Sequence, residues 1–228
     1  MSSLNKTKEQ ILKHHGGDGD HARSMITSSY AKRHDESFWL FWNEKIALNH
    51  QQGDSIVDLG AGIGQFINDC ATRYPDSQIY GIDAADYMVE HTLMLPKNAK
   101  IIQDDLHNPT ANIENNSVSM VMANMVVHEL TQPIKMFKTT HNWLKKGGRF
   151  CVIDLVRQPL KEYLEYKYKE TSVGADETSI ADLENAFEHF LEHNRYHAED
   201  IIYMLQACGF KLIEQEKTGR FIRIVVEK

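Results

Sequence analysis

A glycine-rich segment preceded by an acidic residue is the part of this sequence best suited to hold a charged ligand. Residues 57–64 read Val-Asp-Leu-Gly-Ala-Gly-Ile-Gly, so Asp58 stands two positions before Gly60. Glycine lets the backbone turn sharply and approach a ligand without a Cβ in the way. The stretch that follows has the spacing of a helix, and the N-terminus of a helix binds anions. The segment therefore predicts a strand-to-helix turn that can receive a negatively charged group.

Polar residues also follow the next three apolar runs of the chain. Asp83 ends the second run, Asp105 follows the third and Asn124 follows the fourth. Open parallel sheets bind their ligands at the carboxyl ends of the strands, so these side chains are expected to meet at one edge. The pattern leaves the third position open by one residue, with Asp105 preferred over Asp104.

The spacing of the glycines separates two kinds of nucleotide-binding loop. A dinucleotide-binding loop has the pattern Gly-X-Gly-X-X-Gly. Counted from Gly60, its third glycine would fall at Gln65, and counted from Gly62 it would fall at Ile67. The spacing therefore disfavours a nicotinamide-dependent oxidoreductase, which is kept as the weaker alternative.

The apolar runs alternate with stretches of helical spacing. Strands are expected over residues 55–59, 78–82, 100–103, 118–123 and 149–153. Helices are expected over residues 63–74, 87–95 and 133–144, with Gly147 and Gly148 following the last of them. Short buried strands separated by amphipathic helices are typical of a parallel sheet covered on both faces.

The C-terminal part of the chain has a different pattern. Residues 198–207 have helical spacing, and residues 211–216 and 221–227 alternate like two strands joined near Gly219. Two strands joined by so short a turn pair antiparallel. The fold class is therefore α/β, a doubly wound, seven-stranded and mostly parallel sheet with an antiparallel C-terminal edge.

Two further segments belong to the same single domain of residues 1–228 but lie outside this core. Residues 1–50 and 157–197 are expected to be helical and to lie near the carboxyl ends of the strands, as lid segments over the ligand. Residues 14–21 contain three histidines and two aspartates among three glycines. With no second ligand cluster at a fixed spacing, they predict a flexible loop and no metal site.

Composition and charge exclude several classes of protein. The chain has 228 residues with 25 Lys and Arg against 32 Asp and Glu, a net charge of −7, which is unfavourable for binding nucleic acid. No apolar stretch approaches the roughly 20 residues that span a bilayer, and no apolar signal segment follows the N-terminus. The three cysteines lie far apart and predict buried reduced thiols. We therefore expect a cytoplasmic protein with no nucleic-acid or membrane partner.

Taken together, the motifs resemble those of class I S-adenosylmethionine-dependent methyltransferases. The sequence Asp-Leu-Gly-Ala-Gly-Ile-Gly at residues 58–64 is similar to the first motif of that family, and Gly-Ile-Asp at 81–83 is similar to the second. Residues 104–106, 123–130 and 145–150 match later motifs in order. The resemblance covers residues 53–156 well and the tail loosely. It implies a Rossmann-like methyltransferase fold and S-adenosyl-L-methionine as cofactor.

The resemblance also implies which residues bind that cofactor. The glycine turn would receive the methionine moiety, Asp83 the ribose hydroxyls, and Asp105 and Leu106 the adenine. From position alone, Tyr30 or Arg33 in the N-terminal segment is expected to close over the methionine carboxylate. The complete expected set is Asp58, Gly60, Ala61, Gly62, Gly64, Asp83, Ala84, Met88, Asp105, Leu106, Asn124, Tyr30 and Arg33.

His128 is the candidate catalytic residue. It follows the fourth strand, where the transferred methyl group would emerge, so it could act as a general base. The alternative is a histidine hydrogen-bonded in the pocket wall. Glu129 and Asp154 also stand at strand ends, where a solvated surface position is expected for each.

The expected reaction is methyl transfer to an O, N or S nucleophile of a small molecule. Nucleic-acid bases are disfavoured as acceptors, because Asn124 is followed by Met125 and Val126, whereas base amino-methylases carry an Asn-Pro-Pro-aromatic motif. Two alternatives retain the cofactor: a protein with non-methylating sulfonium chemistry, or a partner subunit. A homodimer is left open.

Overall fold

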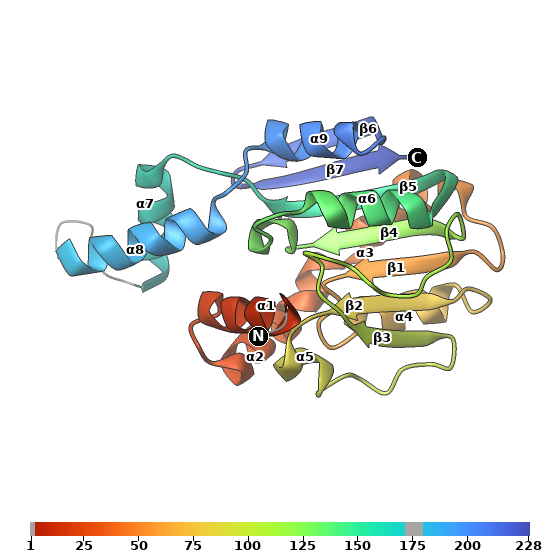
Figure 1. The fold of residues 1–228 in the computed structure, drawn as a ribbon, viewed down its shortest axis with the longest axis horizontal. Coiled ribbons are helices and arrows are strands. Elements are labelled where there is room, and N and C mark those ends of the chain that lie inside the picture. Colours follow the sequence, from red (N-terminus) through yellow and green to blue (C-terminus); the bar gives the residue numbers. More distant parts are fainter. Residues whose placement is uncertain (1–2, 172–179) are drawn as a thin grey trace.

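The apolar runs of the sequence form the strands of one sheet in the computed structural model, which describes residues 3–171 and 180–228. The strands are β1 (Ser55–Leu59), β2 (Ile79–Asp83), β3 (Ala99–Gln103), β4 (Val118–Asn124), β5 (Leu144–Leu155), β6 (Lys211–Thr218) and β7 (Phe221–Glu227). Their order across the sheet is β3-β2-β1-β4-β5-β7-β6 (Figure 1). The first five pair in parallel, and β7 runs antiparallel to both β5 and β6. The expected fold class is confirmed.

Helices cover both faces of this sheet because both faces of its central strands are apolar. One face packs against α6 (Ile134–Trp143) and α9 (Ala198–Ala207) around the buried Phe137 and Phe150. The other packs against α4 (Gln65–Arg73) and α3 (Glu36–Phe41), the latter continuing into a π-helical turn at Trp42–Ile46. A 3-10 turn at Ala47–Asn49 leads to the loop before β1.

The helix expected over residues 87–95 and the strand expected over 149–153 differ most from the structure. The helix expected over residues 87–95 is a single turn, α5 (Asp86–Val89). The Leu93 amide donates to the carbonyl of Ile63 at 3.0 Å, so the chain after α5 hydrogen-bonds to the glycine turn and does not extend the helix. Strand β5 begins at Leu144 and includes Gly147, because the chain enters the sheet as soon as α6 ends.

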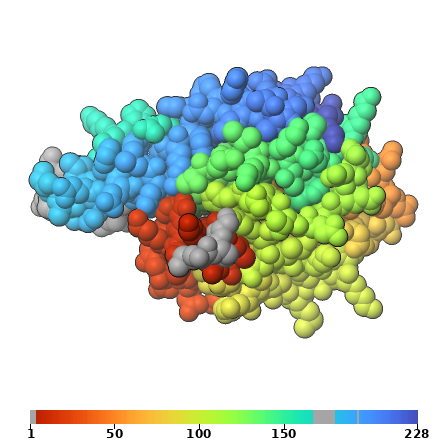
Figure 2. Space-filling view, viewed as in Figure 1, coloured from red at the N-terminus to blue at the C-terminus, as the bar shows by residue number. Residues whose placement is uncertain are grey.

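The N-terminal segment and the insertion lie beside the carboxyl ends of the parallel strands (Figure 1). The N-terminal segment begins with α1 (Ser3–His14) and α2 (Gly19–Arg33), and the insertion carries α7 (Leu160–Thr171) and α8 (Ile180–His193). In the space-filling view the N-terminal residues fill the gap between α8 and the β2–α5 side of the core (Figure 2). Lys13 pairs with Glu192 of α8 at 2.7 Å, and Lys8 pairs with Asp86 of α5 at 2.6 Å. Helix α1 therefore bridges the insertion and the core.

The expected loop at residues 14–21 is shorter in the structure. His14 is the last residue of α1 and is buried, and α2 begins at Gly19. Asp18 caps α2 by accepting a hydrogen bond from the His21 amide at 3.0 Å. All three cysteines are buried free thiols, as expected. Within the described chain, no helix has the length and apolarity needed to cross a bilayer.

Candidate functional site

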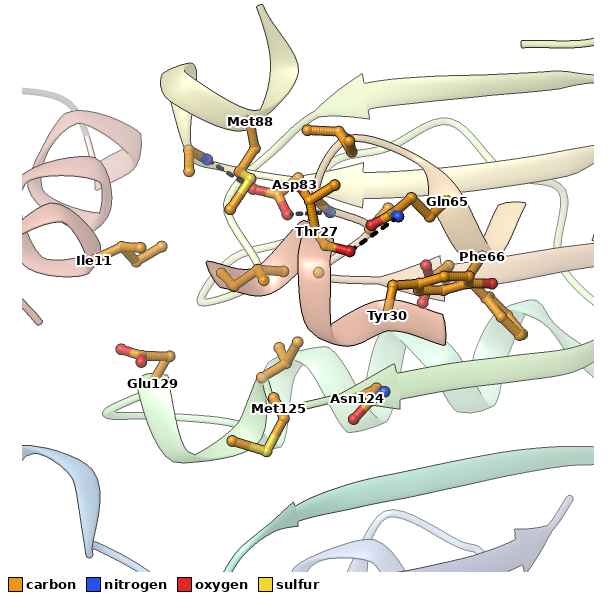
Figure 3. Close-up of a pocket in the computed structure, with 18 of the residues that line it drawn as sticks. Ile11, Thr27, Tyr30, Gln65, Phe66, Asp83, Met88, Asn124, Met125 and Glu129 are labelled. Atoms are coloured by element: carbon orange, nitrogen blue, oxygen red, sulfur yellow. Dashed lines mark hydrogen bonds between the residues drawn. The ribbon is translucent and has the colours of Figure 1, made fainter. Parts of the chain in front are cut away.

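A cavity of about 550 Å³ opens at the carboxyl ends of β1, β2 and β4. Its volume lies in the range of ~300–1,000 Å³ that is usual for small-molecule sites. Figure 3 shows Asp83 and Met88 on one side of this cavity and Asn124 and Met125 on the other. Residues of α1 and α2 complete the wall, among them Ile11 and Tyr30.

The glycine turn forms the floor of the cavity between β1 and α4. Gly60 has a φ of +76°, a conformation that favours glycine, and a Cβ there would lie 2.1 Å from Cγ2 of Val126. The Gly60 amide donates to the carbonyl of Ile82 at 2.7 Å, which ties the turn to β2. The turn therefore needs glycine at this position for two reasons, its backbone angle and the contact with the β4 side of the cavity.

Asp83 is positioned by the backbone of two neighbouring segments. Its Oδ2 accepts a hydrogen bond from the Gly62 amide at 2.8 Å, and its Oδ1 accepts one from the Ala85 amide at 2.9 Å. Burial raises the pKa of this carboxyl above its ordinary value, and these backbone hydrogen bonds partly offset the rise. Since each carboxylate oxygen can accept more than one hydrogen bond, Asp83 can still receive a pair of hydroxyl groups.

Asp58 is a buried carboxyl group that also faces the cavity. No donor within residues 3–171 and 180–228 forms a hydrogen bond to its side chain. Burial, and then the nearby charge of Asp83, raises the pKa of Asp58 well above its ordinary value. A buried carboxylate without a partner is costly, so a cationic group in the cavity would stabilise the ionised form.

The two acidic residues after β3 have different roles. Asp104 stabilises the following loop, and Asp105 lies back from the cavity. Asp104 accepts hydrogen bonds from the Thr110 amide at 2.6 Å and the Ala111 amide at 2.7 Å, and so holds the following loop. Oδ1 of Asp105 accepts one from the Thr7 hydroxyl at 3.0 Å. Thr7 and Leu106 line the cavity, whereas Asp105 does not. Helix α1 therefore reaches the place where the sequence predicted that Asp105 would be open to a ligand.

Tyr30 and Arg33 on α2 both line the cavity, with different capacity to bind a ligand. The Tyr30 hydroxyl donates to Asp69 at 2.7 Å, and burial, then that hydrogen bond, raises the pKa of Tyr30. Arg33 donates from one terminal nitrogen to the carbonyl of Ile26 at 3.2 Å. Its Nε is buried and has no hydrogen-bond partner in the described part of the chain. Arg33 thus still has a free N–H group that can donate a hydrogen bond to an anion.

The β4 side of the cavity is a turn with an unusual backbone conformation. Asn124 ends β4, and Met125 has a φ of +60°, which is uncommon for a residue other than glycine. The chain then enters the short 3-10 turn η3 (Val127–Glu129). Asn124, Met125 and Val126 all line the cavity, and so does the buried His128.

His128 is held between two carboxylates. Its Nδ1 lies 2.6 Å from Oδ1 of Asp154, and its Nε2 lies 3.1 Å from Oε1 of Glu129. Burial would lower the pKa of this imidazole, but the charge and hydrogen bond of Asp154, with smaller effects from Glu129, outweigh burial and raise it to about 10. The side chain is therefore an imidazolium at neutral pH.

Three residues around His128 have positions that the sequence did not predict. Asp154 and Glu129, expected at a solvated surface, are both buried. Glu129 forms a short contact with Nδ1 of His14 on α1, a residue 115 positions away in the chain. His14 stood in the segment expected to be a loop, so only the tertiary structure brings these groups together.

The structure places most of the expected site residues around one cavity. Those that line it are Asp58, Gly60, Ala61, Gly62, Asp83, Ala84, Met88, Leu106, Asn124, Tyr30, Arg33 and His128. Gly64 and Asp105 stand outside the lining. Gly64 has a φ of +92° and precedes α4, so it shapes the turn.

Comparison with known proteins shows which family this architecture belongs to. Residues 31–215 match the family model described as "Methyltransferase domain". A carboxy-S-adenosyl-L-methionine synthase from Nautilia profundicola is 25% identical over 170 residues, which are 71% of each chain. A phosphoethanolamine N-methyltransferase from Triticum aestivum is 28% identical over 181 residues, and this chain covers 32% of its length.

A solved structure with a similar fold is the geranyl diphosphate C-methyltransferase from Streptomyces coelicolor A3(2). It was solved in complex with Mg²⁺, geranyl diphosphate and S-adenosyl-L-homocysteine. The TM-score is 0.59 at 12% identity, over 84% of this chain and 79% of the other.

Proposed function

This chain belongs to the methyltransferase-domain family, and from that premise we propose that it transfers the methyl group of S-adenosyl-L-methionine to a small-molecule nucleophile. The observation that carries the proposal is the charge pattern of the cavity. Two carboxyl groups, Asp58 and Asp83, and Arg33 with its unpaired Nε line the same cavity as the glycine turn. This pattern suits a ligand that has a cationic part, an anionic part and a ribose.

The residues present fit that cofactor group by group. Asp83 would accept from the ribose hydroxyls, and Asp58 would face the methionine ammonium. Arg33 would receive the carboxylate through its unpaired nitrogen. Met88, Ala84 and Leu106 would contact the adenine, whereas Asp105 accepts a hydrogen bond from Thr7 and lies behind this part of the wall. When bound, the cofactor supplies an electrophilic methyl group on a positively charged sulfur.

The acceptor enters beside the β4 turn in this proposal. A cavity of about 550 Å³ has to hold both molecules, so the acceptor is small. Helices α1 and α8 lie against this side of the site and are proposed as the lid, joined by the Lys13–Glu192 pair. Closing such a lid aligns donor and acceptor and excludes water.

Asp58 makes cofactor binding depend on pH in a predictable direction. Because burial raises its pKa, a fraction of the unliganded protein carries the neutral acid, which does not attract an ammonium group. We expect the affinity for S-adenosyl-L-methionine to rise with pH until Asp58 is ionised in the free protein. Isothermal titration calorimetry between pH 5 and pH 8 measures this, and Asp58→Asn should bind more weakly with a flatter pH profile. An equally steep profile in Asp58→Asn would remove Asp58 from this role.

Transfer of a radiolabelled methyl group tests the function directly. The full chain is incubated with labelled S-adenosyl-L-methionine and a panel of small amines, thiols, hydroxyl compounds and carboxylates. We expect label in the product of at least one acceptor class, and much less label when the Asp83→Ala variant replaces the wild-type protein at the same cofactor concentration. Failure to bind the cofactor at all would refute the proposal.

A second candidate is sulfonium chemistry without methyl transfer. The relative described as a carboxy-S-adenosyl-L-methionine synthase covers 71% of this chain, and it favours this alternative. Cofactor binding with no labelled product from any acceptor, together with a change in the mass of the cofactor itself, would support it. The oxidoreductase alternative is not proposed, since the chain belongs to the methyltransferase-domain family.

A further inference from the structure

Asp154 is the most completely enclosed carboxyl group around the cavity, with 0% of its surface exposed. Its Oδ2 accepts hydrogen bonds from the amides of Val126 at 3.0 Å and Val127 at 2.5 Å. Its Oδ1 accepts one from the amide of Leu155 at 2.7 Å and lies 2.6 Å from Nδ1 of His128. Every group that faces this carboxylate is therefore a donor, provided that His128 carries a proton on Nδ1.

The turn that Asp154 holds is the β4 side of the cavity. Its amide partners directly follow Met125, whose left-handed backbone angle is uncommon for a side chain of that size. The Met125 amide itself donates to the carbonyl of Ile153 on β5 at 2.8 Å. Such a conformation persists only where the surroundings fix it, and here β5 fixes it through the backbone and through Asp154.

The other side of this turn is fixed from the insertion and from α1. Arg195, which follows α8, donates to the carbonyl of His128 at 2.9 Å. Glu129 contacts both His128 and His14, and His15 on the N-terminal segment lies 3.9 Å from the same carboxylate. In the described part of the chain, the charged groups that face His128 include Asp154 from β5 and Glu129 from η3, with Arg195 at its carbonyl. With the Arg195 guanidinium beside the imidazolium, these two cations match the two carboxylates in number.

We propose that Asp154 is a positioning residue that acts through His128: it holds the imidazole protonated and fixes the turn against which donor and acceptor are aligned. The proposal rests on the methyl transfer proposed above. Its consequence is that His128 does not remove a proton from the acceptor, because its ring nitrogens already face Asp154 and Glu129 as donors. The acceptor then has to arrive as a free nucleophile or lose its proton to solvent.

The requirement at this position is for a carboxylate and not only for a polar side chain. An asparagine has one acceptor oxygen and one NH₂ donor. In Asp154→Asn, the NH₂ group would therefore face either the two turn amides or Nδ1–H of His128, and a donor would meet a donor. The variant should lower the pKa of His128 and loosen the turn together.

Nuclear magnetic resonance of ¹⁵N-labelled histidine in the full chain tests the proposal without any acceptor. In the wild-type protein we expect His128 to remain an imidazolium at pH 8 and to titrate near pH 10. In Asp154→Asn its midpoint should fall by about two units or more, since an opposite charge in contact shifts a pKa by ~1–3 units. A neutral His128 imidazole in the wild-type protein at pH 7, or an unmoved midpoint in Asp154→Asn, would overturn the proposal.

The matched control is Asp104→Asn, which also removes a buried carboxylate that accepts backbone hydrogen bonds. It should lower stability without moving the His128 midpoint.

With an acceptor identified, Asp154→Asn should lower kcat by about tenfold or more and change the KM for the cofactor little. If no acceptor is methylated, the proposed function fails while the titration still decides the role of Asp154. Should Asp154→Asn not fold, the wild-type titration still tests whether His128 is protonated at pH 8. Asp154→Glu, which keeps the charge, should then leave the His128 midpoint raised, and a fallen midpoint in a folded Asp154→Glu protein would contradict the role of the charge.

Discussion

Replacing Asp83 by alanine is expected to weaken binding of S-adenosyl-L-methionine by at least about 100-fold. The Asp83 carboxylate is held in place by the amides of Gly62 and Ala85, so its orientation is set before a ligand arrives. Hydrogen bonds to a charged group contribute ~1.5–3 kcal/mol each, and two bonds to a ribose amount to a factor of about 100 or more. Isothermal titration calorimetry with the cofactor and with S-adenosyl-L-homocysteine measures the loss.

The control for this change is Asp76→Ala, which alters the net charge equally. Asp76 is exposed and precedes β2, at the end of the strand opposite Asp83. Its substitution should leave the affinity unchanged. Thermal unfolding of both variants without ligand shows whether they are folded, because only a folded variant reports on the site. Binding of the cofactor to a folded Asp83→Ala protein within threefold of wild type would contradict the placement of the ribose.

The parallel core could be predicted from the sequence because its signals are local. The central strands are short apolar runs, and the structure places Asp83 and Asn124 at the ends of β2 and β4. The glycine turn is local as well, since Gly60 and Gly64 both need left-handed backbone angles. For this reason one cavity is lined by Asp58, Gly60, Asp83 and Asn124.

The acceptor side could not be predicted because its partners are distant in the chain. Asp154 and His128 are 26 residues apart, and His14 and Glu129 are 115 residues apart. Local pattern treats an acidic residue at a strand end as solvated, which is the usual state of a carboxylate. Only a packed structure shows that donors surround Asp154 and make its burial tolerable.

The short helix α5 illustrates a similar limit. Its periodicity extends to Leu95, and propensity alone allows a longer helix. The Leu93 amide instead hydrogen-bonds to the carbonyl of Ile63, and the side chain of Leu95 would lie 3.2 Å from a Cβ at Gly64. Tertiary contacts with the glycine turn therefore outweigh the local preference.

Substitution of Gly60 by alanine should lower both the free energy of unfolding and cofactor binding. A residue other than glycine at a left-handed φ costs ~1–2 kcal/mol. The added Cβ would also lie 2.1 Å from Cγ2 of Val126, so the β4 turn has to move, and overpacking of this kind costs a further ~1–3 kcal/mol. Urea unfolding measures the total, and calorimetry measures the accompanying loss of cofactor affinity.

Two further variants separate the backbone cost from the contact with Val126. Gly53 has a φ of +87° with no atom within 4 Å of a built Cβ, so Gly53→Ala carries the backbone cost alone. Gly60→Ala should therefore be the more destabilising of the two by the cost of the contact. Adding Val126→Ala to Gly60→Ala removes the clashing methyl group, so the double variant should regain part of the lost cofactor affinity. If Gly60→Ala lowers the free energy of unfolding no more than Gly53→Ala does, the close contact between Gly60 and Val126 does not fix the position of the two turns.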